Sequence, residues 1–211
     1  MINKEIWLNF TIRCYSMGMA LVVNFLQMIP GKKYQFRIDE RIKMPFLERD
    51  VRKKDVVWLH ASSLGESKLL LSFLDILTKK NSETLFVVTA STPTGVDFLL
   101  KNKKRCMAGI GFLPIDTITR VTRFVNRFRV TRVWLMETEL WPSLIWTCLQ
   151  KNIPVGIING RLEEKSFRTY KKMSWLFKPL LSSLDKVLAQ DQKYAERFAA
   201  LGVCPENIAV T

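Results

Sequence analysis

Histidine, paired cysteines and the common nucleotide-binding glycine motifs are scarce or absent in this 211-residue sequence. His60 is the only histidine and no Gly-x-Ser-x-Gly motif occurs, so a serine hydrolase triad has little support. The four cysteines include no Cys-x-x-Cys pair, so neither a metal site nor a disulfide framework is indicated, and a reducing compartment fits. Neither Gly-x-Gly-x-x-Gly nor a Walker loop is present, which disfavours simple NAD and ATP enzymes. We therefore predict no metal and no cofactor.

Acidic residues are also few, since 33 Lys and Arg stand against 19 Asp and Glu and give a formal net charge of +14. A balance this basic predicts an anionic partner such as a phosphate, a nucleic acid or an acidic membrane surface. The 48% of hydrophobic residues excludes a disordered chain, and 211 residues are enough for one sizeable domain.

Residues 14–29 form an apolar helical segment that Pro30 ends. It is shorter than the roughly 20 apolar residues that a membrane span needs, although residues 6–12 could extend it. Polar side chains gather on one side of the helix, which suits a helix lying in a membrane interface, and no signal-peptide cleavage site follows. We predict a membrane-associating helix over residues 1–30; packing on the domain's own core is the alternative.

The following stretch, residues 31–54, is basic, with nine Lys or Arg against four Asp or Glu. Near an anionic leaflet each such charge contributes about 1 kcal/mol. A solvated linker would have the same composition. Because the basic stretch adjoins the apolar helix, we favour an anionic membrane surface as a partner.

From residue 56 onward, short β-branched runs alternate with helical patterns. The predicted strands cover 56–61, 84–90, 109–113, 131–136, 154–159, 186–190 and 208–211. The predicted helices cover 66–79, 95–102, 117–128, 142–151, 165–183 and 191–201. This alternation predicts an α/β domain over 31–211, with a doubly wound, mostly parallel, Rossmann-like sheet.

Unusual polar residues follow the predicted strands at their carboxyl ends, where ligands bind in open parallel sheets. Thr92 and Thr94 precede a predicted helix and could cradle an anion at its N-terminus, or could simply form a turn. Arg161 is a candidate anion clamp, with a surface ion pair as the alternative. Glu137 and Glu139 follow an apolar strand, where carboxylates are costly to desolvate without cationic partners or a function.

The stretch "HASSLGES" raises a choice for Glu66. Ser63 and Glu66 satisfy the Ser-x-x-Glu pattern of a capping box, so Glu66 could do no more than stabilise a helix start. Gly65, however, permits close backbone approach of a ligand, and a helix N-terminus favours an ionised carboxylate that could act as a base. Spacing alone leaves both interpretations open.

Six motifs in series carry a resemblance that covers nearly all of residues 35–211. They are "HASSLGE", "TASTPTG", "FLPID", "METELWPS", "INGRLEEKS" and "AQDQKYAERFAALG". In this order they resemble the N-terminal half of the 3-deoxy-D-manno-octulosonic acid (Kdo) transferases of Gram-negative lipopolysaccharide synthesis.

The resemblance implies a metal-independent, inverting glycosyltransferase of the two-domain GT-B type that moves Kdo from CMP-Kdo to the lipid A precursor. It places the activity at the cytoplasmic face of the inner membrane. It also implies that Glu66 is the general base, that Glu137 stabilises the transition state, and that Ser63, Gly65, Thr92, Thr94, Glu139 and Arg161 contact substrate. The family's donor-binding domain is expected outside these 211 residues, which are therefore not expected to transfer sugar alone.

Two other functions stay open. The first is a non-catalytic, membrane-associated α/β binding module that has lost transferase activity. The second is a nucleic-acid binder, which the charge allows but which no recognised motif supports, so we expect no nucleic-acid partner.

Overall fold

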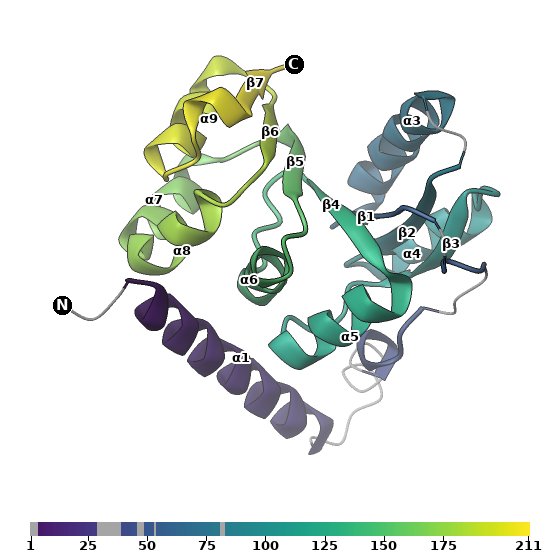
Figure 1. The fold of residues 1–211 in the computed structure, drawn as a ribbon, viewed down its shortest axis with the longest axis horizontal. Helices are drawn as coiled ribbons and strands as arrows, with labels where there is room; N and C mark the ends of the chain where they lie inside the picture. Colours follow the sequence, from purple (N-terminus) through teal and green to yellow (C-terminus); the bar gives the residue numbers. More distant parts are fainter. Residues whose placement is uncertain (1–3, 29–38, 46–48, 53, 81–82) are drawn as a thin grey trace.

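Apolar, β-branched runs form a seven-stranded parallel sheet in the computed structural model, which describes residues 4–28, 39–45, 49–52, 54–80 and 83–211 (Figure 1). The strand order is β3-β2-β1-β4-β5-β6-β7. The strands are β1 (Val56–Ala61), β2 (Leu85–Ala90), β3 (Met107–Phe112), β4 (Val130–Met136), β5 (Val155–Gly160), β6 (Lys186–Ala189) and β7 (Ile208–Val210). The predicted doubly wound α/β fold is confirmed.

Helices cover the two faces of the sheet through two separate apolar cores. One face packs on α3 (Leu64–Lys80) and α4 (Pro93–Lys101). The other packs on α5 (Ile118–Phe128), α6 (Pro142–Gln150), α8 (Ser174–Leu181) and α9 (Gln192–Ala200). Figure 1 shows α3 and α4 on one side of the strands and α5, α6 and α8 on the other.

The direction of the chain through the sheet reverses once. It runs outward from β1 through β2 to β3, and then returns to place β4 against the other side of β1. The loops that follow β1 and β4 therefore lead to helices on opposite faces, which opens a crevice between them at the carboxyl edge. The fold thus has one topological switch point, between β1 and β4.

The single helix predicted over 165–183 is wrong, because the chain forms α7 (Glu164–Lys172) and α8 with a break at Met173. The two pieces have different surroundings. None of the residues of α7 is buried, whereas α8 buries four apolar side chains in the core. A single straight helix could not leave the first segment exposed and bury the second in the core, so the backbone turns at Met173. The Met173 carbonyl accepts the amide of Phe177 at 3.0 Å.

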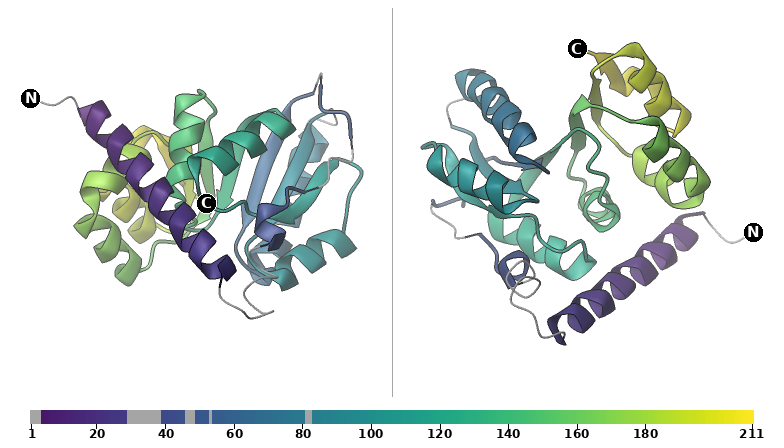
Figure 2. Two further views of the ribbon diagram at one scale, coloured as in Figure 1. Left: turned by 90° about the horizontal axis from the view of Figure 1, so that it is seen from below. Right: turned by 180° about the vertical axis from the view of Figure 1, so that it is seen from behind.

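The N-terminal helix α1 (Lys4–Met28) begins earlier than the predicted 14–29, because residues 6–12 do extend it. The stretch Ile6–Gln27 is long and apolar enough to cross a membrane by length and composition, so the expectation that it is too short is wrong. The alternative, packing on the domain, is also present. Ile12 is fully buried, Trp146 Nε1 donates to Asn9 Oδ1 at 2.9 Å, and the Ile118 amide donates to Ser16 Oγ at 2.9 Å. The views in Figure 2 show α1 lying along one side of the domain.

The side of α1 that faces away from the domain is apolar and exposed. Seven large apolar side chains on it are 52–65% exposed, and we call them the α1 apolar face. They are Ile6, Trp7, Phe10, Met17, Leu21, Val22 and Phe25. The opposite side of α1 packs on the domain through both apolar and polar side chains, including the buried Ile12, Val23 and Ser16. The helix therefore has apolar side chains on its exposed side as well as on its buried side, unlike an ordinary surface helix.

A buried carboxylate joins three elements beside α1. Asp116, 2% exposed, accepts the amides of Ser143 at 3.0 Å and Leu144 at 2.9 Å, so it caps the start of α6. Tyr15 of α1 also hydrogen-bonds to it. Burial raises the pKa of Asp116 to about 6, although these hydrogen bonds oppose the shift.

Asp116 predicts an unusual pH dependence of stability. The folded protein protonates Asp116 at higher pH than the unfolded chain does, so its contribution to the free energy of unfolding increases as pH falls. Between about pH 7 and about pH 4.5 the wild type should gain about 2 kcal/mol relative to Asp116→Asn. Urea unfolding of both proteins across this range measures the difference, and a difference that stays constant or shrinks on acidification would contradict the assignment.

Candidate active site

The carboxyl ends of β1 and β4 meet at the switch point, and acidic side chains gather there. The loop after β1 leads to Glu66 in the first turn of α3, and the loop after β4 carries Glu137 and Glu139. The charges of Glu137 and Glu139 are both close enough to Glu66 to raise its pKa. Three carboxylates from two loops therefore lie near one another at the carboxyl edge of the sheet.

Glu66 is held tightly at the start of α3. Its Oε2 accepts the Ser62 amide at 2.7 Å, and its Oε1 accepts the Ser63 hydroxyl at 3.0 Å. The Glu66 amide in turn donates to Ser63 Oγ at 3.3 Å. These are the contacts of a capping box, shifted by one residue because the carboxylate reaches the Ser62 amide rather than that of Ser63.

Capping does not use the whole carboxylate of Glu66. Each oxygen accepts one of these hydrogen bonds, whereas an ionised carboxylate offers about four acceptor positions. Burial, with smaller contributions from Glu137 and Glu139, raises the pKa of Glu66, while the hydrogen bonds from Ser62 and Ser63 lower it. The residue is 8% exposed. The side chain is thus a desolvated carboxylate with acceptor capacity left over.

Glu139 has the opposite balance. Burial raises the pKa of this carboxyl, but interactions with His60, Ser62 and Trp141 together outweigh burial and hold its pKa below the usual range. Trp141 Nε1 donates to Glu139 Oε2 at 2.9 Å, and His60 Nε2 lies 3.7 Å from the same oxygen. Two neighbouring carboxylates therefore differ in proton affinity because of their surroundings.

His60 is completely buried under this cluster. Its Nδ1 lies 3.1 Å from the Thr89 carbonyl and 2.9 Å from the Thr89 hydroxyl. Its Nε2 faces Ser91 Oγ at 3.3 Å. The imidazole thus connects β1 to β2 beneath the acidic loops, and these contacts give His60 a structural role.

Backbone strain marks the carboxyl ends of β4 and β5. Glu137 and Asn159 adopt left-handed φ angles of 54° and 56° although neither is glycine. Two further left-handed residues, Arg129 and Asn152, follow helices, where this conformation is ordinary. Strained residues at a ligand-binding edge are typical of functional sites.

The predicted ligand-binding loops differ in how much space they leave. A side chain at Gly65 would meet only Ser63 Oγ, at 3.9 Å, so the edge of the sheet is open there. At Gly95 an added carbon would lie 3.0 Å from three neighbouring side chains. Thr92 caps α4 by accepting the Gly95 amide at 3.2 Å, and Thr94 Oγ1 lies 3.5 Å from Thr92 Oγ1.

Arg161 lies beyond the carboxylate cluster, after β5. Its guanidinium pairs with Glu163 at 2.7 Å, and both side chains are 51% exposed. The Tyr194 hydroxyl donates to Glu163 Oε1 at 3.0 Å. The surface ion pair that the sequence left as an alternative is therefore present, and an anion at Arg161 would have to compete with Glu163.

Two contributors were not foreseen from the sequence. The indole of Trp141 donates to Glu139. Ser91 was not singled out, although it directly follows β2 and faces His60. The position of Ser91 at a strand end was an available signal, whereas the direction of the Trp141 ring depends on tertiary contacts.

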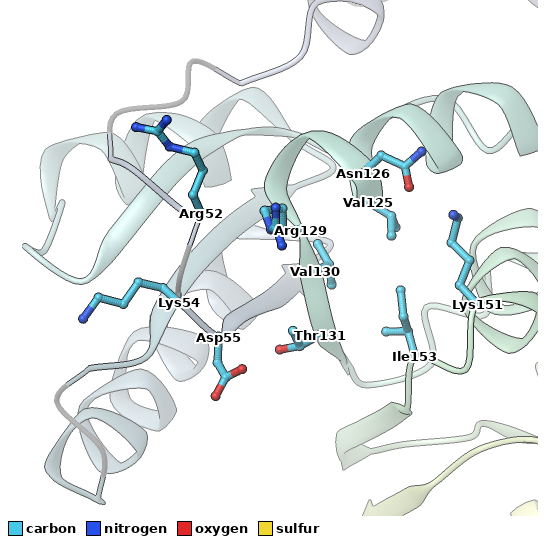
Figure 3. A pocket seen from close by; sticks show the side chains of 10 residues that line it. All are labelled: Arg52, Lys54, Asp55, Val125, Asn126, Arg129, Val130, Thr131, Lys151 and Ile153. Carbon is cyan, nitrogen blue, oxygen red and sulfur yellow. The ribbon is translucent and has the colours of Figure 1, made fainter.

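The described residues of the carboxylate cluster show no sign of a metal site, and a basic groove lies elsewhere in the domain. In the part of the chain that the structure describes, no three His, Cys, Asp or Glu side chains are grouped as metal ligands. A groove of about 680 Å³, lined by residues such as Lys54, Arg129 and Lys151, lies at the amino ends of β1 and β4 (Figure 3). It is therefore at the opposite edge from the carboxylates.

Residues 36–211 match the sequence profile of a family described as 3-deoxy-D-manno-octulosonic-acid transferase (kdotransferase). The chain is 30% identical over 182 residues to the 3-deoxy-D-manno-octulosonic acid transferase of Rickettsia bellii, covering 86% of this chain and 43% of that protein. It is also 30% identical over 161 residues to the transferase of that name from Haemophilus influenzae, covering 74% and 36%. The chain thus spans less than half the length of these relatives.

The fold also resembles that of solved sugar-nucleotide enzymes. UDP-GlcNAc 2-epimerase from Neisseria meningitidis, bound to UDP-GlcNAc, superposes with a TM-score of 0.55 at 16% identity, over 74% of this chain and 45% of that one. The S. aureus MnaA–UDP structure gives 0.54 at 17%, over 75% and 44%. At these identities the likeness concerns the fold alone. The profile match over most of the sequence and the 30% identical relatives carry the assignment: the chain belongs to the kdotransferase family.

Proposed function

We propose that this chain is the acceptor-binding half of an enzyme that transfers Kdo from CMP-Kdo to the lipid A precursor. The observation that carries the proposal is the position of Glu66, a desolvated carboxylate held at the carboxyl edge of the switch point near Glu137 and Glu139. Membership of the kdotransferase family supports the sugar and the reaction type. The inner membrane's cytoplasmic face is the proposed location.

Glu66 acts as the general base in this proposal. Its carboxylate takes the proton of an acceptor sugar hydroxyl, and the hydroxyl oxygen bonds to the anomeric carbon of Kdo. The bond from that carbon to the phosphate oxygen breaks, and CMP leaves with the electron pair, so the configuration is inverted. No metal takes part. Burial supports this role, since a carboxylate with a raised pKa is a stronger base than a free one.

Glu137 and Glu139 supply negative charge on the other side of the crevice. A breaking glycosidic bond develops positive charge on the sugar ring, which a nearby carboxylate stabilises. The strained backbone of Glu137 fixes its direction, and the low pKa of Glu139 keeps that residue ionised. Ser63, Gly65, Thr92, Thr94 and Arg161 are proposed to contact the acceptor around this centre.

A non-catalytic binding module is the second candidate. The capping contacts favour it, because they account for Ser63 and Glu66 without any reaction. The two candidates differ in whether the proton affinity of Glu66 matters.

Replacement of Glu66 by Gln separates them. Gln can keep both capping contacts but cannot accept a proton, so we expect transfer to fall by about 10² to 10⁴. Thermal unfolding should stay unchanged. Because the chain spans 43% of the Rickettsia bellii relative, turnover is measured in a chimera that joins residues 1–211 to the remainder of that protein. Near-normal turnover would make Glu66 a cap only.

The control is a cap away from the carboxylates. Asp191 caps α9 by accepting the Tyr194 amide at 2.8 Å, so Asp191→Ala should cost about 0.5–2 kcal/mol of stability with little loss of turnover. The wild-type chimera should also lose activity as pH falls through the pKa of Glu66, which lies above that of a free glutamate. The Gln variant should lack this acidic limb.

Gly65→Ala tests close approach of the acceptor. Alanine meets no protein atom closer than 3.9 Å and is favoured in helices, so stability should rise by up to about 1 kcal/mol. If the acceptor lies against this backbone, its binding should weaken about tenfold or more. Acceptor titration and thermal unfolding of the same variant check both effects, and unchanged binding would remove Gly65 from the site.

Acceptor binding by the 211-residue chain tests the partner. Phosphate charge alone would give equal binding to lipid A precursor and to oligonucleotides of equal charge. Because the proposed site also contacts the sugar of the acceptor, vesicles that carry lipid A precursor should bind at least about tenfold more tightly. Preference for the oligonucleotide would contradict the proposed acceptor.

A further inference from the structure

A groove between α1 and α5 joins the α1 apolar face to a cluster of arginines. Its volume is about 480 Å³, and Arg13, Met17 and Ala20 line it from α1. These residues are spaced by four and three, so they share one side of the helix. Arg120 and Arg123 line the opposite wall from α5. Met17 is 63% exposed and also belongs to the α1 apolar face, so the groove opens beside that face.

The groove is strongly cationic. Three guanidinium groups line it, and no Asp or Glu occurs among its described lining residues. Across the described ranges, Arg13, Arg120 and Arg123 form no salt bridge, whereas Arg52, Arg132, Arg161, Arg168 and Arg197 are each paired with a carboxylate. Three unpaired positive charges facing one groove repel one another unless an anion lies between them.

Contacts between α1 and the start of α5 fix the two walls of the groove relative to each other. The Ile118 amide donates to Ser16 Oγ at 2.9 Å directly beside it, so α1 and the start of α5 are joined at this point. Val23 of α1 and Ile115, in the loop before α5, are both buried together further along. The arginines are therefore carried by elements that do not move independently.

We propose that this groove binds the phosphate of an anionic membrane phospholipid while the α1 apolar face lies in the bilayer interface. An exposed apolar helix face needs a non-aqueous neighbour, and a bilayer supplies acyl chains with phosphates at their boundary. The arginines lie at the border of the apolar face, where headgroups of such a bilayer would be. Guanidinium groups bind phosphate oxygens through paired hydrogen bonds. This surface is separate from the carboxylate crevice, so the proposal stands whether or not the chain takes part in sugar transfer.

Vesicle binding by the 211-residue chain tests the proposal. The triple variant Arg13→Gln, Arg120→Gln, Arg123→Gln should bind phosphatidylcholine vesicles containing phosphatidylglycerol about 100-fold more weakly than the wild type, because each charge contributes about fivefold. Its binding to vesicles of phosphatidylcholine alone should not change. A second variant, Met17→Ser with Leu21→Ser, should weaken binding to both kinds of vesicle.

A matched control removes three charges from the α3 and α4 side of the sheet. Lys79, Lys101 and Arg105 are exposed there, and their replacement by Gln should weaken binding to the anionic vesicles by less than about threefold. An equal loss of vesicle binding in the two triple variants would mean that the vesicles are attracted by net charge alone, and it would overturn the groove as a phosphate-binding site. Should the first triple variant unfold, Arg123→Gln alone, at an exposed position, should still weaken binding about fivefold.

The source of the phosphate is tested by competition. Replacing chloride with inorganic phosphate at equal ionic strength should leave vesicle binding unchanged, because the lipid is held by its acyl chains as well. Displacement by inorganic phosphate would overturn the lipid as the occupant and identify a site for a small anion.

Discussion

The reversal of strand order between β1 and β4 is the constraint on which the candidate site depends. It sends the two loops that follow these strands to opposite faces, so their first polar residues border one crevice. Glu66 reaches that crevice from one loop, and Glu137 and Glu139 reach it from the other. No other neighbouring pair of strands in the described sheet has this relation, since every other crossover continues in one direction. The chemistry is therefore located by topology before any residue is assigned a role.

Neighbouring carboxylates repel one another when both are ionised, so their surroundings decide which of them holds its charge more strongly. Glu139 is stabilised as an anion by an indole, a hydroxyl and an imidazole, which together outweigh burial, whereas Glu66 has the Ser62 amide and the Ser63 hydroxyl, which do not. The result is two carboxylates of different proton affinity within one crevice. Under the proposed function, this difference would keep Glu139 charged next to Glu66 as the group that exchanges protons. The capping contacts of Glu66 contribute to this arrangement because they fix its direction.

The sequence predicted those features that depend on local patterns. The range of β1 agrees at both ends, and the carboxyl-edge position of Glu66, Glu137 and Glu139 follows from the strand pattern alone. The break at Met173 was missed because apolar spacing continues through it, and only burial of α8 against the core requires the turn. The hydrogen bond from Trp141 was missed for a similar reason, since ring direction is decided by packing. Tertiary contacts thus decided what local patterns could not.

Polar residues on the helix α1 are compatible with two arrangements, one in which they face water and one in which they face the domain. Asn9 and Ser16 on an apolar helix indicate an interface helix whose polar side faces water, but in this fold they hydrogen-bond to Trp146 and Ile118. The domain therefore covers one side of α1, where Ile12 and Val23 are also buried, and the α1 apolar face lies on the exposed side. A helix crossing the bilayer would leave Asn9 and Ser16 without these hydrogen-bond partners. A helix that keeps them lies parallel to the domain surface, with its apolar face available to a bilayer.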